Sequence, residues 1–439
     1  MKLKYKNNNK NEYTKMIHSL SLPLLMNYLI SSIFEILDKT IIGHYSTESF
    51  AAIGIAASVI YVITSSLGIF SVAFNIVAAK ALGKNDEDMF ERTFYSAMLI
   101  SFFIGLIYII ISLTCGKAFF KYVYGLNRPI LTTLLAYFYP ASITVLLNMI
   151  LFLFSVYFRN RHNTKISFLS TAVATVTNIF FDYVLVYGRI GFPELGVRGA
   201  AWGSIIGLLA GIMIYVLGKV ITNKKRKVMR LSKACSLKMV KLYVPLLGQD
   251  IMECTVFTMI ISGIVARLGT YAMASYSLLS SLGNILILPV YAYSSSAITL
   301  ALQKKAANDE SAVNEILKTT VALSFTAISC ISVICLLFPE KIMGLIVSDS
   351  QTIETTKTLI LYLILAQLVN IFYQIYKSYL QGTGHEKFVF MTSVIVSLLS
   401  LIWIYVLSVM VGVGGIYIGM CMNYLVLTVI YFVKLKKYM

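Results

Sequence analysis

The stretch "EILDKTIIGHY", residues 35–45, sets two acids and a lysine among isoleucine and leucine. Its Asp38-Lys39-Thr40 triplet also begins the phosphorylated loop of ion-pumping ATPases, so a soluble catalytic domain has to be considered first. The triplet is followed by Ile-Ile where that loop needs Gly-Thr, and the chain contains no GxxxxGK(S/T) phosphate loop. The apolar residues around Asp38 therefore favour a charged side chain inside a hydrophobic segment over a nucleophile in a soluble domain.

The composition indicates that these surroundings are a membrane. Hydrophobic residues make up 58% of the 439 residues, charged residues only 13%, and the mean hydropathy is +0.80. Such a chain cannot cover itself with polar surface. The beginning of the chain, "MKLKYKNNNKNEYTK", is a polar tail rather than a cleavable signal. We therefore expect a multi-pass protein of the plasma membrane, with the lipid bilayer as its main partner.

Apolar runs of about 20 residues, the length that spans a bilayer as a helix, recur along the whole chain. The alternating ten-residue segments of a β-barrel are absent, so the predicted fold is all-α. Twelve transmembrane helices are predicted, at residues 17–42, 50–79, 93–114, 130–157, 166–188, 194–218, 242–266, 272–301, 316–338, 353–380, 388–410 and 413–433.

The basic residues predict the orientation of these helices. Of the 37 Lys and Arg residues, 28 fall in the N-terminal tail, the C-terminal tail and every second loop, with Lys219 and Lys377 counted among them. Eight fall in the other loops and Lys39 lies inside the first helix. This bias predicts that both termini are cytoplasmic. It also accounts for the net charge of +18 without a nucleic-acid partner.

The second half of the chain repeats the first when Pro23-Leu24-Leu25 is aligned with Pro245-Leu246-Leu247. We call this alignment the repeat register. It places Asn148 on Asn370. After small shifts, "GKNDED", residues 83–88, corresponds to "AANDES", residues 306–311, and "GVRGAAWG", residues 196–203, to "GVGGIYIG", residues 412–419. Six helices per copy make the repeats parallel, so we expect two six-helix bundles related by a pseudo-twofold axis along the membrane normal, with a cleft between them.

This repeat sets the predicted domain boundaries. They are an N-terminal tail (1–16), an N-terminal lobe (17–221), a cytoplasmic linker (222–241), a C-terminal lobe (242–433) and a C-terminal tail (434–439).

Four acids, Glu35, Asp38, Asp182 and Glu253, lie well inside predicted helices. A carboxylate at that depth costs about 2.5 to 3.5 kcal/mol on insertion scales, so each is a candidate functional group. Glu35 and Lys39 are four residues apart and can neutralise one another, which leaves Glu35 a supporting residue and Asp38 the stronger candidate.

Amide side chains accompany these acids. Asn178 and Asp182, four residues apart on one helical face, can share a proton or a small cation. Glu253 has no basic neighbour within a turn and forms, with Asn370, a candidate polar site of the second lobe. Asn148 and Asn370 can equally be hydrogen-bonding contacts between helices.

The sequence gives little indication of a metal site, a disulfide framework or an enzyme. The six cysteines are scattered singly, without the spacing of a metal site or a disulfide framework. No HExxH or GxSxG motif occurs, and the four histidines lie at helix ends or in loops, so an enzyme is not expected. The 29 tyrosines, 25 phenylalanines and 18 methionines suit helix packing and membrane interfaces, and a minority can hold flat organic cations.

Two stretches carry a family likeness. "FEILDKTIIGHYSTESFAAIG" (34–54) with "ALGKND" (81–86), and "TNIFFDYVLVYGRIGFPELGVRGAAWG" (177–203), resemble the multidrug and toxic compound extrusion (MATE) family. The shared features are Asp-x-x-x-x-Gly, Ala-Ala-x-Gly, Leu-Gly-x-x-Asp, and Asn-x-x-x-Asp followed by Gly-Val-x-Gly-Ala-Ala. The likeness covers nearly the whole chain.

The resemblance implies a set of functional residues. In that family the first-helix aspartate and the fifth-helix Asn/Asp pair form the cation site of the N-terminal lobe, which corresponds here to Asp38, Asn178 and Asp182. Some sodium-coupled members also use a glutamate and an aspartate in the second lobe. Glu253 matches the first, but Asn370 stands in place of the second. We therefore expect the coupling site in the N-terminal lobe.

The resemblance also implies an activity. The chain is expected to export amphipathic, often cationic, organic compounds in exchange for H⁺ or Na⁺ by alternating access, as a monomer. No cofactor and no structural metal are expected, and Na⁺ would bind only transiently at Asp38, Asn178 and Asp182. The alternative is a flippase for a lipid-linked oligosaccharide, from the same wider superfamily. Such a flippase needs basic residues in its helices to hold pyrophosphate, and Lys39 is the only central one expected here.

Overall fold

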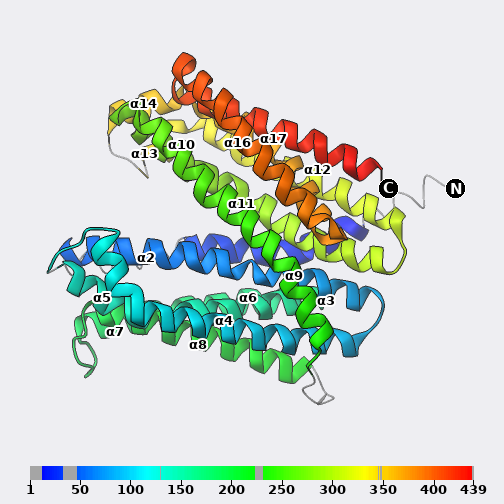
Figure 1. Ribbon diagram of the computed structural model, residues 1–439, viewed down its shortest axis with the longest axis horizontal. Coiled ribbons are helices and arrows are strands. Elements are labelled where there is room, and N and C mark those ends of the chain that lie inside the picture. Colours follow the sequence, from blue (N-terminus) through cyan, green and yellow to red (C-terminus); the bar gives the residue numbers. More distant parts are fainter. Residues whose placement is uncertain are drawn as a thin grey trace. The chain divides into compact units, whose positions relative to one another are not determined.

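The computed structural model describes residues 12–32, 47–128, 130–222, 231–344, 346 and 349–437. Throughout these ranges the regular structure is helical, and no strand occurs in them (Figure 1). Ten helices of the described chain are long and apolar enough to cross a membrane. The predicted all-α membrane fold is confirmed.

The chain folds into two compact units. The N-terminal unit is Leu22–Tyr243, and the C-terminal unit is Val244–Met439 together with Met1–Ser21. A first helix, residues 12–32, therefore contributes its beginning to the C-terminal unit, whereas the predicted N-terminal lobe starts at residue 17.

Seven labelled helices follow in the N-terminal unit. They are α2 (Thr47–Gly68), α3 (Phe70–Gly83), α4 (Glu87–Tyr122), α5 (Ile130–Ala141), α6 (Ile143–Asn160), α7 (Lys165–Tyr187) and α8 (Val197–Thr222). Two predicted spans are each interrupted once. The predicted helix 50–79 divides between α2 and α3 at Ile69, and the predicted helix 130–157 divides between α5 and α6 next to Pro140, which cannot donate a backbone hydrogen bond.

The remaining helices form the C-terminal unit, except that the first part of α9, up to Tyr243, belongs to the N-terminal unit. They are α9 (Lys233–Asp250), the π-helical turn η1 (Ile251–Val256), α10 (Phe257–Ala266), α11 (Thr270–Ala306), α12 (Glu310–Leu337), α13 (Pro339–Gly344), α14 (Ser350–Lys357), α15 (Ile360–Leu380), the turn η2 (Gln381–His385), α16 (Glu386–Val411) and α17 (Val413–Lys436). Helix α9 begins inside the predicted linker 222–241, so the second half of that segment is helical.

The repeated Asn-Asp of the two halves has a local structural reason. Asn85 and Asn308 both adopt the left-handed conformation, with φ of 57° and 61°. The aspartate that follows each asparagine caps the next helix: Asp86 accepts from the backbone N–H of Met89 at 2.8 Å, and Asp309 from that of Ala312 at 3.1 Å. The same turn and cap therefore start α4 and α12.

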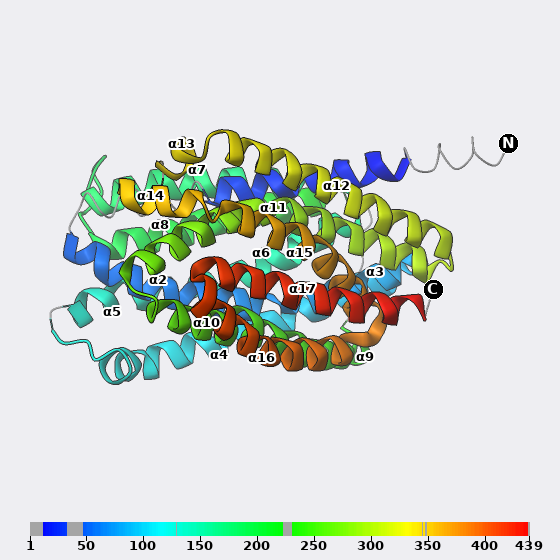
Figure 2. The same cartoon turned by 90° about the horizontal axis from the view of Figure 1, so that it is seen from above.

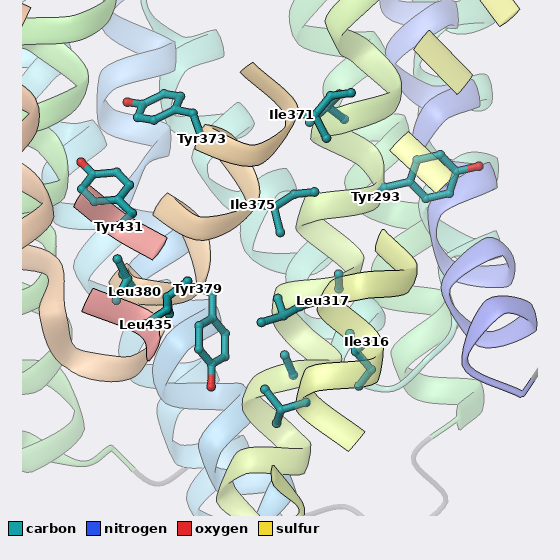
Figure 3. Packing of buried hydrophobic residues seen from close by; sticks show 14 of the residues in the cluster. Tyr293, Ile316, Leu317, Ile371, Tyr373, Ile375, Tyr379, Leu380, Tyr431 and Leu435 are labelled. Carbon is teal, nitrogen blue, oxygen red and sulfur yellow. The ribbon is translucent and has the colours of Figure 1, made fainter. Parts of the chain in front are cut away.

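Each unit has its own hydrophobic core. In the N-terminal unit one cluster joins α2, α4, α5 and α8 through residues such as Ala56, Phe138 and Ala201. In the C-terminal unit one cluster includes Ile17 and Leu20 of the first helix and continues through α11, α12, α15 and α17. Figure 3 shows part of this cluster, with Tyr373 and Tyr379 on α15. The packing of Ile17 and Leu20 explains why the beginning of the first helix belongs to this unit.

The closest helix pair of the N-terminal unit is α7 with α8, which run side by side (Figures 1 and 2). Gly199, Gly203, Gly207 and Gly211 of α8 recur every four residues and face α7. A Cβ added at Gly207 would lie 2.6 Å from the Cβ of Asn178 and 2.7 Å from the carbonyl oxygen of Ala174. Small residues at this spacing let two membrane helices approach backbone to backbone. This glycine stripe brings α8 directly against α7.

A buried cluster of charges joins α4 to the end of α8. Glu91 accepts a hydrogen bond from Tyr157 at 2.6 Å and forms ion pairs with Arg161 and Lys219, each at 2.9 Å. The ammonium group of Lys219 also lies 4.0 Å from the ring centroid of Phe94. Lys219 was expected in a loop, whereas it lies in the last turn of α8. The Glu91 cluster thus holds α8 to its neighbours at one end.

The glycine stripe predicts a cost for even one methyl group. Gly207→Ala should lower the free energy of unfolding by about 1–3 kcal/mol, because neither the helix backbone nor the Asn178 Cβ can move aside without displacing α7. Gly263→Ala in α10 is the matched control, since nothing lies within 4 Å of its added Cβ. Thermal unfolding of the detergent-solubilised chain, followed by circular dichroism, would compare them. Equal melting temperatures would contradict close α7–α8 packing.

The Glu91 cluster predicts a second stability effect. Glu91→Gln should destabilise the chain by roughly 3 kcal/mol, because it leaves the largely buried Lys219 without its carboxylate and Arg161 with only the more exposed Glu87. Glu340→Gln, in an exposed ion pair with Lys357, is the control and should change the melting temperature little. A Glu91→Gln protein that melts like the Glu340→Gln protein would show that the cluster stabilises nothing.

Candidate functional site

The predicted Asn178–Asp182 pair lies on one face of α7. The side-chain nitrogen Nδ2 of Asn178 donates to Oδ2 of Asp182 at 2.5 Å. Only 5% of Asn178 and 0% of Asp182 is exposed, so the carboxyl group is entirely enclosed by protein. A carboxylate in such a place is costly unless a proton, a cation or hydrogen-bond donors balance its charge.

The glycine stripe of α8 creates the space for this carboxyl group. A Cβ at Gly203 would overlap Oδ1 of Asp182, and a Cβ at Gly207 would meet Asn178. Further along the same interface, the hydroxyl of Ser170 donates to the backbone carbonyl of Gly211 at 2.9 Å. The close approach of the α7 and α8 backbones therefore fixes the position of the Asn178–Asp182 pair.

The second half of the chain provides an internal comparison for this pair. In the repeat register, Ser400 and Ile404 of α16 correspond to Asn178 and Asp182. Their helix packs on α17 in the same way, because a Cβ at Gly419 would lie 2.5 Å from Cγ1 of Ile404. An apolar side chain thus serves the packing of this helix pair, so packing alone does not require the acid at position 182.

The remaining predicted residues of the N-terminal lobe are placed only in part. Asp38, Glu35 and Lys39 lie outside the residues that the structure describes. Asn148 donates to the backbone carbonyl of Thr144 at 2.9 Å, within its own helix α6. The association of Asp38 with Asn178 and Asp182 stays a prediction.

In the C-terminal unit, Glu253 lies at the centre of a polar cluster. Its Oε1 accepts from Nε2 of Gln249 and from the hydroxyl of Tyr373, both at 2.7 Å. Its Oε2 accepts from the ammonium group of Lys377 at 3.1 Å. We call these four residues the Glu253 cluster. The expectation that Glu253 lacks a basic partner considered neighbours along its own helix, and the partner comes from α15 instead.

The position of Lys377 differs from the expected one. It was counted with a cytoplasmic loop, but it lies in the last turn of α15, four residues after Tyr373. The predicted helix 353–380 already contained this position, but the contact with Glu253 joins two helices and cannot be inferred from either one alone. Because Lys377 lies near the end of α15, the expectation that Lys39 is the only central basic residue stays a prediction.

The backbone near the Glu253 cluster departs from a regular α-helix at two points. Glu253 itself lies in the π-helical turn η1, and Gln381, at the start of η2, donates to the side-chain oxygen of Gln249 at 2.7 Å. Insertions of this type are often found at functional sites. Figure 3 shows the rings of Tyr373 and Tyr431 close to one another, and their centroids are 6.0 Å apart.

Asn370 does not bond to Glu253 in the described structure. It is 4% exposed, and its Nδ2 donates to Oε1 of Gln367 at 3.0 Å. The predicted second site thus contains Glu253 with Gln249, Tyr373 and Lys377, while Asn370 belongs to a neighbouring contact.

The Asn178–Asp182 pair and the Glu253 cluster lie in two segments of the chain that both match one known protein family. The MatE family profile matches residues 23–184 and again residues 245–406. The chain belongs to the MatE family. The two matches begin at Pro23 and Pro245, which confirms the repeat register inferred from the sequence, and MATE proteins are multidrug transporters rather than enzymes.

Curated relatives extend over nearly the whole chain. The probable multidrug resistance protein NorM of Thermotoga maritima is 24% identical over 416 residues, which cover 93% of this chain and 89% of the relative. The uncharacterized transporter YisQ of Bacillus subtilis is 22% identical over 415 residues, 92% of this chain and 90% of that protein. This MATE protein is therefore a multi-pass membrane transporter.

Solved structures show the same fold at low sequence identity. A variant of the Vibrio cholerae MATE transporter VcmN superposes with a TM-score of 0.87 at 16% identity, covering 98% of both chains. A MOP superfamily transporter from Pyrococcus furiosus superposes with a TM-score of 0.83 at 15% identity, covering 96% of this chain and 94% of the other. The MATE fold is thus preserved although most residues differ.

The internal comparison predicts the stability of a swapped pair. The double variant Asn178→Ser, Asp182→Ile imports the residues of the equivalent α16–α17 interface and removes a buried carboxyl group. It should fold and melt no lower than the parent, since burying an apolar side chain avoids the cost of the acid. Size-exclusion profiles and melting temperatures would test this. A protein that no longer folds would show that the pair is structural.

Proposed function

We propose that this MATE transporter exports amphipathic, often cationic, organic compounds in exchange for H⁺ or Na⁺ by alternating access. The coupling ion binds at Asp182 with Asn178, and Asp38 completes the site. The curated relatives named as probable multidrug resistance proteins support the substrate class.

The observation that carries this proposal is the enclosed carboxyl group of Asp182. It is fully buried, it accepts from the neutral amide of Asn178, and its equivalent in the other half is Ile404. Because helix packing does not require an acid at position 182, the carboxyl group of Asp182 can serve to bind and release a proton or Na⁺. Proton or Na⁺ binding neutralises the carboxylate, and release restores a charge that favours a hydrated state of the unit.

The membrane potential can supply the driving force. One elementary charge that moves inward across 100 mV provides about 2.3 kcal/mol. That energy supports a concentration gradient of about 50-fold for each charge exchanged. A single exchanged ion is therefore enough for efflux of an uncharged compound, whereas one-for-one exchange with a monovalent cationic compound moves no net charge and is driven by the concentration gradient of the ion.

The alternative function, flipping of a lipid-linked oligosaccharide, requires basic groups that can hold pyrophosphate. Lys219 and Lys377 are basic residues in the last turns of α8 and α15. Both form ion pairs, with Glu91 and Glu253, so their charge is already balanced by the protein. Drug export is the better supported function.

The orientation of the chain, its membrane and its oligomeric state are also proposed. We place both termini in the cytoplasm, from the distribution of Lys and Arg, and the chain in the plasma membrane as a monomer. No cofactor takes part, and Na⁺ is a transported ion rather than a structural metal.

Loss of the coupling carboxyl groups predicts loss of efflux. Asp182→Asn and Asp38→Asn should each lower efflux of a cationic dye from reconstituted vesicles at least about tenfold, because the variants cannot gain and lose a charge at this site. The Asn178→Ser, Asp182→Ile protein should be equally inactive although it folds. The exposed variant Glu340→Gln is the control. Normal efflux by Asp182→Asn would reject the assignment.

Imposed gradients distinguish the coupling ions in the same vesicles. A pH gradient and a Na⁺ gradient are applied separately at fixed membrane potential. Dye movement that follows only one of them identifies the ion, and movement that ignores both would reject ion-coupled antiport.

A further inference from the structure

The Glu253 cluster holds a positive charge of its own. The ammonium group of Lys377 lies 3.1 Å from Oε2 of Glu253 and 4.7 Å from the ring centroid of Tyr373. The carboxylate and the ring face are both groups that attract a monovalent cation. The side chains of Lys377 and Glu253 are only 15% and 18% exposed, so the pair is largely removed from solvent.

The other atoms of the cluster fix the carboxylate of Glu253 in this position. Gln249 and Tyr373 both donate to Oε1, and Gln381 holds Gln249 in turn. The oxygen Oε2 faces Lys377. The cluster is therefore a built site for one cation, and that cation is covalently attached to α15.

The internal repeat shows that the two charges occur together. In the repeat register, Glu253 corresponds to Ser31 and Lys377 to Ser155, while Tyr373 corresponds to Leu151. The N-terminal half thus has an uncharged residue in place of each member of this ion pair, just as the C-terminal half lacks the Asn178–Asp182 pair. Asp182 of the N-terminal half thus lies beside an amide, whereas Glu253 of the C-terminal half lies beside an ammonium group, and neither arrangement is repeated at the equivalent position.

We propose that the ammonium group of Lys377 is a tethered substitute for an exchangeable cation at Glu253. Because this cation cannot leave, Glu253 takes no Na⁺ from solution in the native chain. Removal of the ammonium group leaves the carboxylate oxygens of Glu253 and the phenol oxygen of Tyr373 without a cation beside them. These are the oxygen ligands that a hard cation such as Na⁺ prefers. Lys377 is thus the residue that excludes the coupling ion from the C-terminal unit.

The experiment measures equilibrium binding of radioactive sodium to the purified, full-length chain in detergent. Lys377→Met removes the charge and keeps a long, flexible side chain. It should bind one more Na⁺ per chain than the native protein. Lys377→Arg keeps the charge and should bind the native amount. The double variant Lys377→Met, Glu253→Gln should lose the additional site again.

Two further measurements can contradict the proposal. Protons compete for a bare carboxylate, so binding to Lys377→Met is measured at neutral and at alkaline pH, and Na⁺ binding should increase with pH. Failure of the additional site to form at either pH, in a protein shown to be folded by circular dichroism, overturns the proposal. The Glu253→Gln variant needs no change at Lys377: it should bind as much Na⁺ as the native chain, and a loss of binding there also overturns it.

This test does not depend on the proposed efflux activity. Sodium binding is measured without a substrate or a gradient, and the residues altered lie outside the Asn178–Asp182 pair. A transporter that ignores Asp182→Asn would reject the coupling site, whereas an unchanged Lys377→Met protein would reject the tethered cation.

Discussion

The free-energy cost of removing a carboxyl group from water constrains both the Asn178–Asp182 pair and the Glu253 cluster. Asp182 is fully enclosed and accepts from Asn178, while Glu253 accepts from two neutral donors and one ammonium group. In an apolar surrounding the charged form of either acid persists only with compensating partners. The ammonium partner, Lys377, is fixed in the chain, whereas we propose that an exchangeable ion balances the charge of Asp182. The proposed division of roles between the two halves follows from this difference.

Local backbone structure makes these arrangements possible. The glycine stripe of α8 lets α7 approach so closely that Asp182 occupies the space beside Gly203, and η1 carries Glu253 on a turn that is wider than an α-helix. The Asn-Asp turns that start α4 and α12 show that the duplicated framework is kept in both halves. Against this common framework, the acids at positions 182 and 253 are local additions, because Ile404 and Ser31, both uncharged, occupy the equivalent positions.

Much of the fold could be predicted from the sequence because apolar segments of spanning length are a strong signal. The interruptions at Ile69 and beside Pro140 were missed because hydropathy is insensitive to a short break inside an apolar run. The four-residue spacing of Asn178 and Asp182 correctly placed both side chains on one face. Lys377 was misplaced because a basic residue near the end of a segment was counted as part of a loop. Its contact with Glu253 is a tertiary one, formed between residues 124 positions apart, and no local pattern reports it.

The length of α4 has a consequence for the Glu91 cluster. Its 36 residues extend over about 54 Å at about 1.5 Å per residue, whereas the hydrocarbon layer is about 30 Å thick. Even a steep tilt of about 40° leaves a vertical span of about 41 Å, which reaches into the headgroup layers. Because Glu91 is only the fifth residue of α4, we expect Arg161 and Lys219 to lie at headgroup depth, where anionic phospholipids compete with Glu91 for these cations. The anchoring of α8, and with it the helix beside Asp182, would then depend on the lipid composition of the surrounding leaflet.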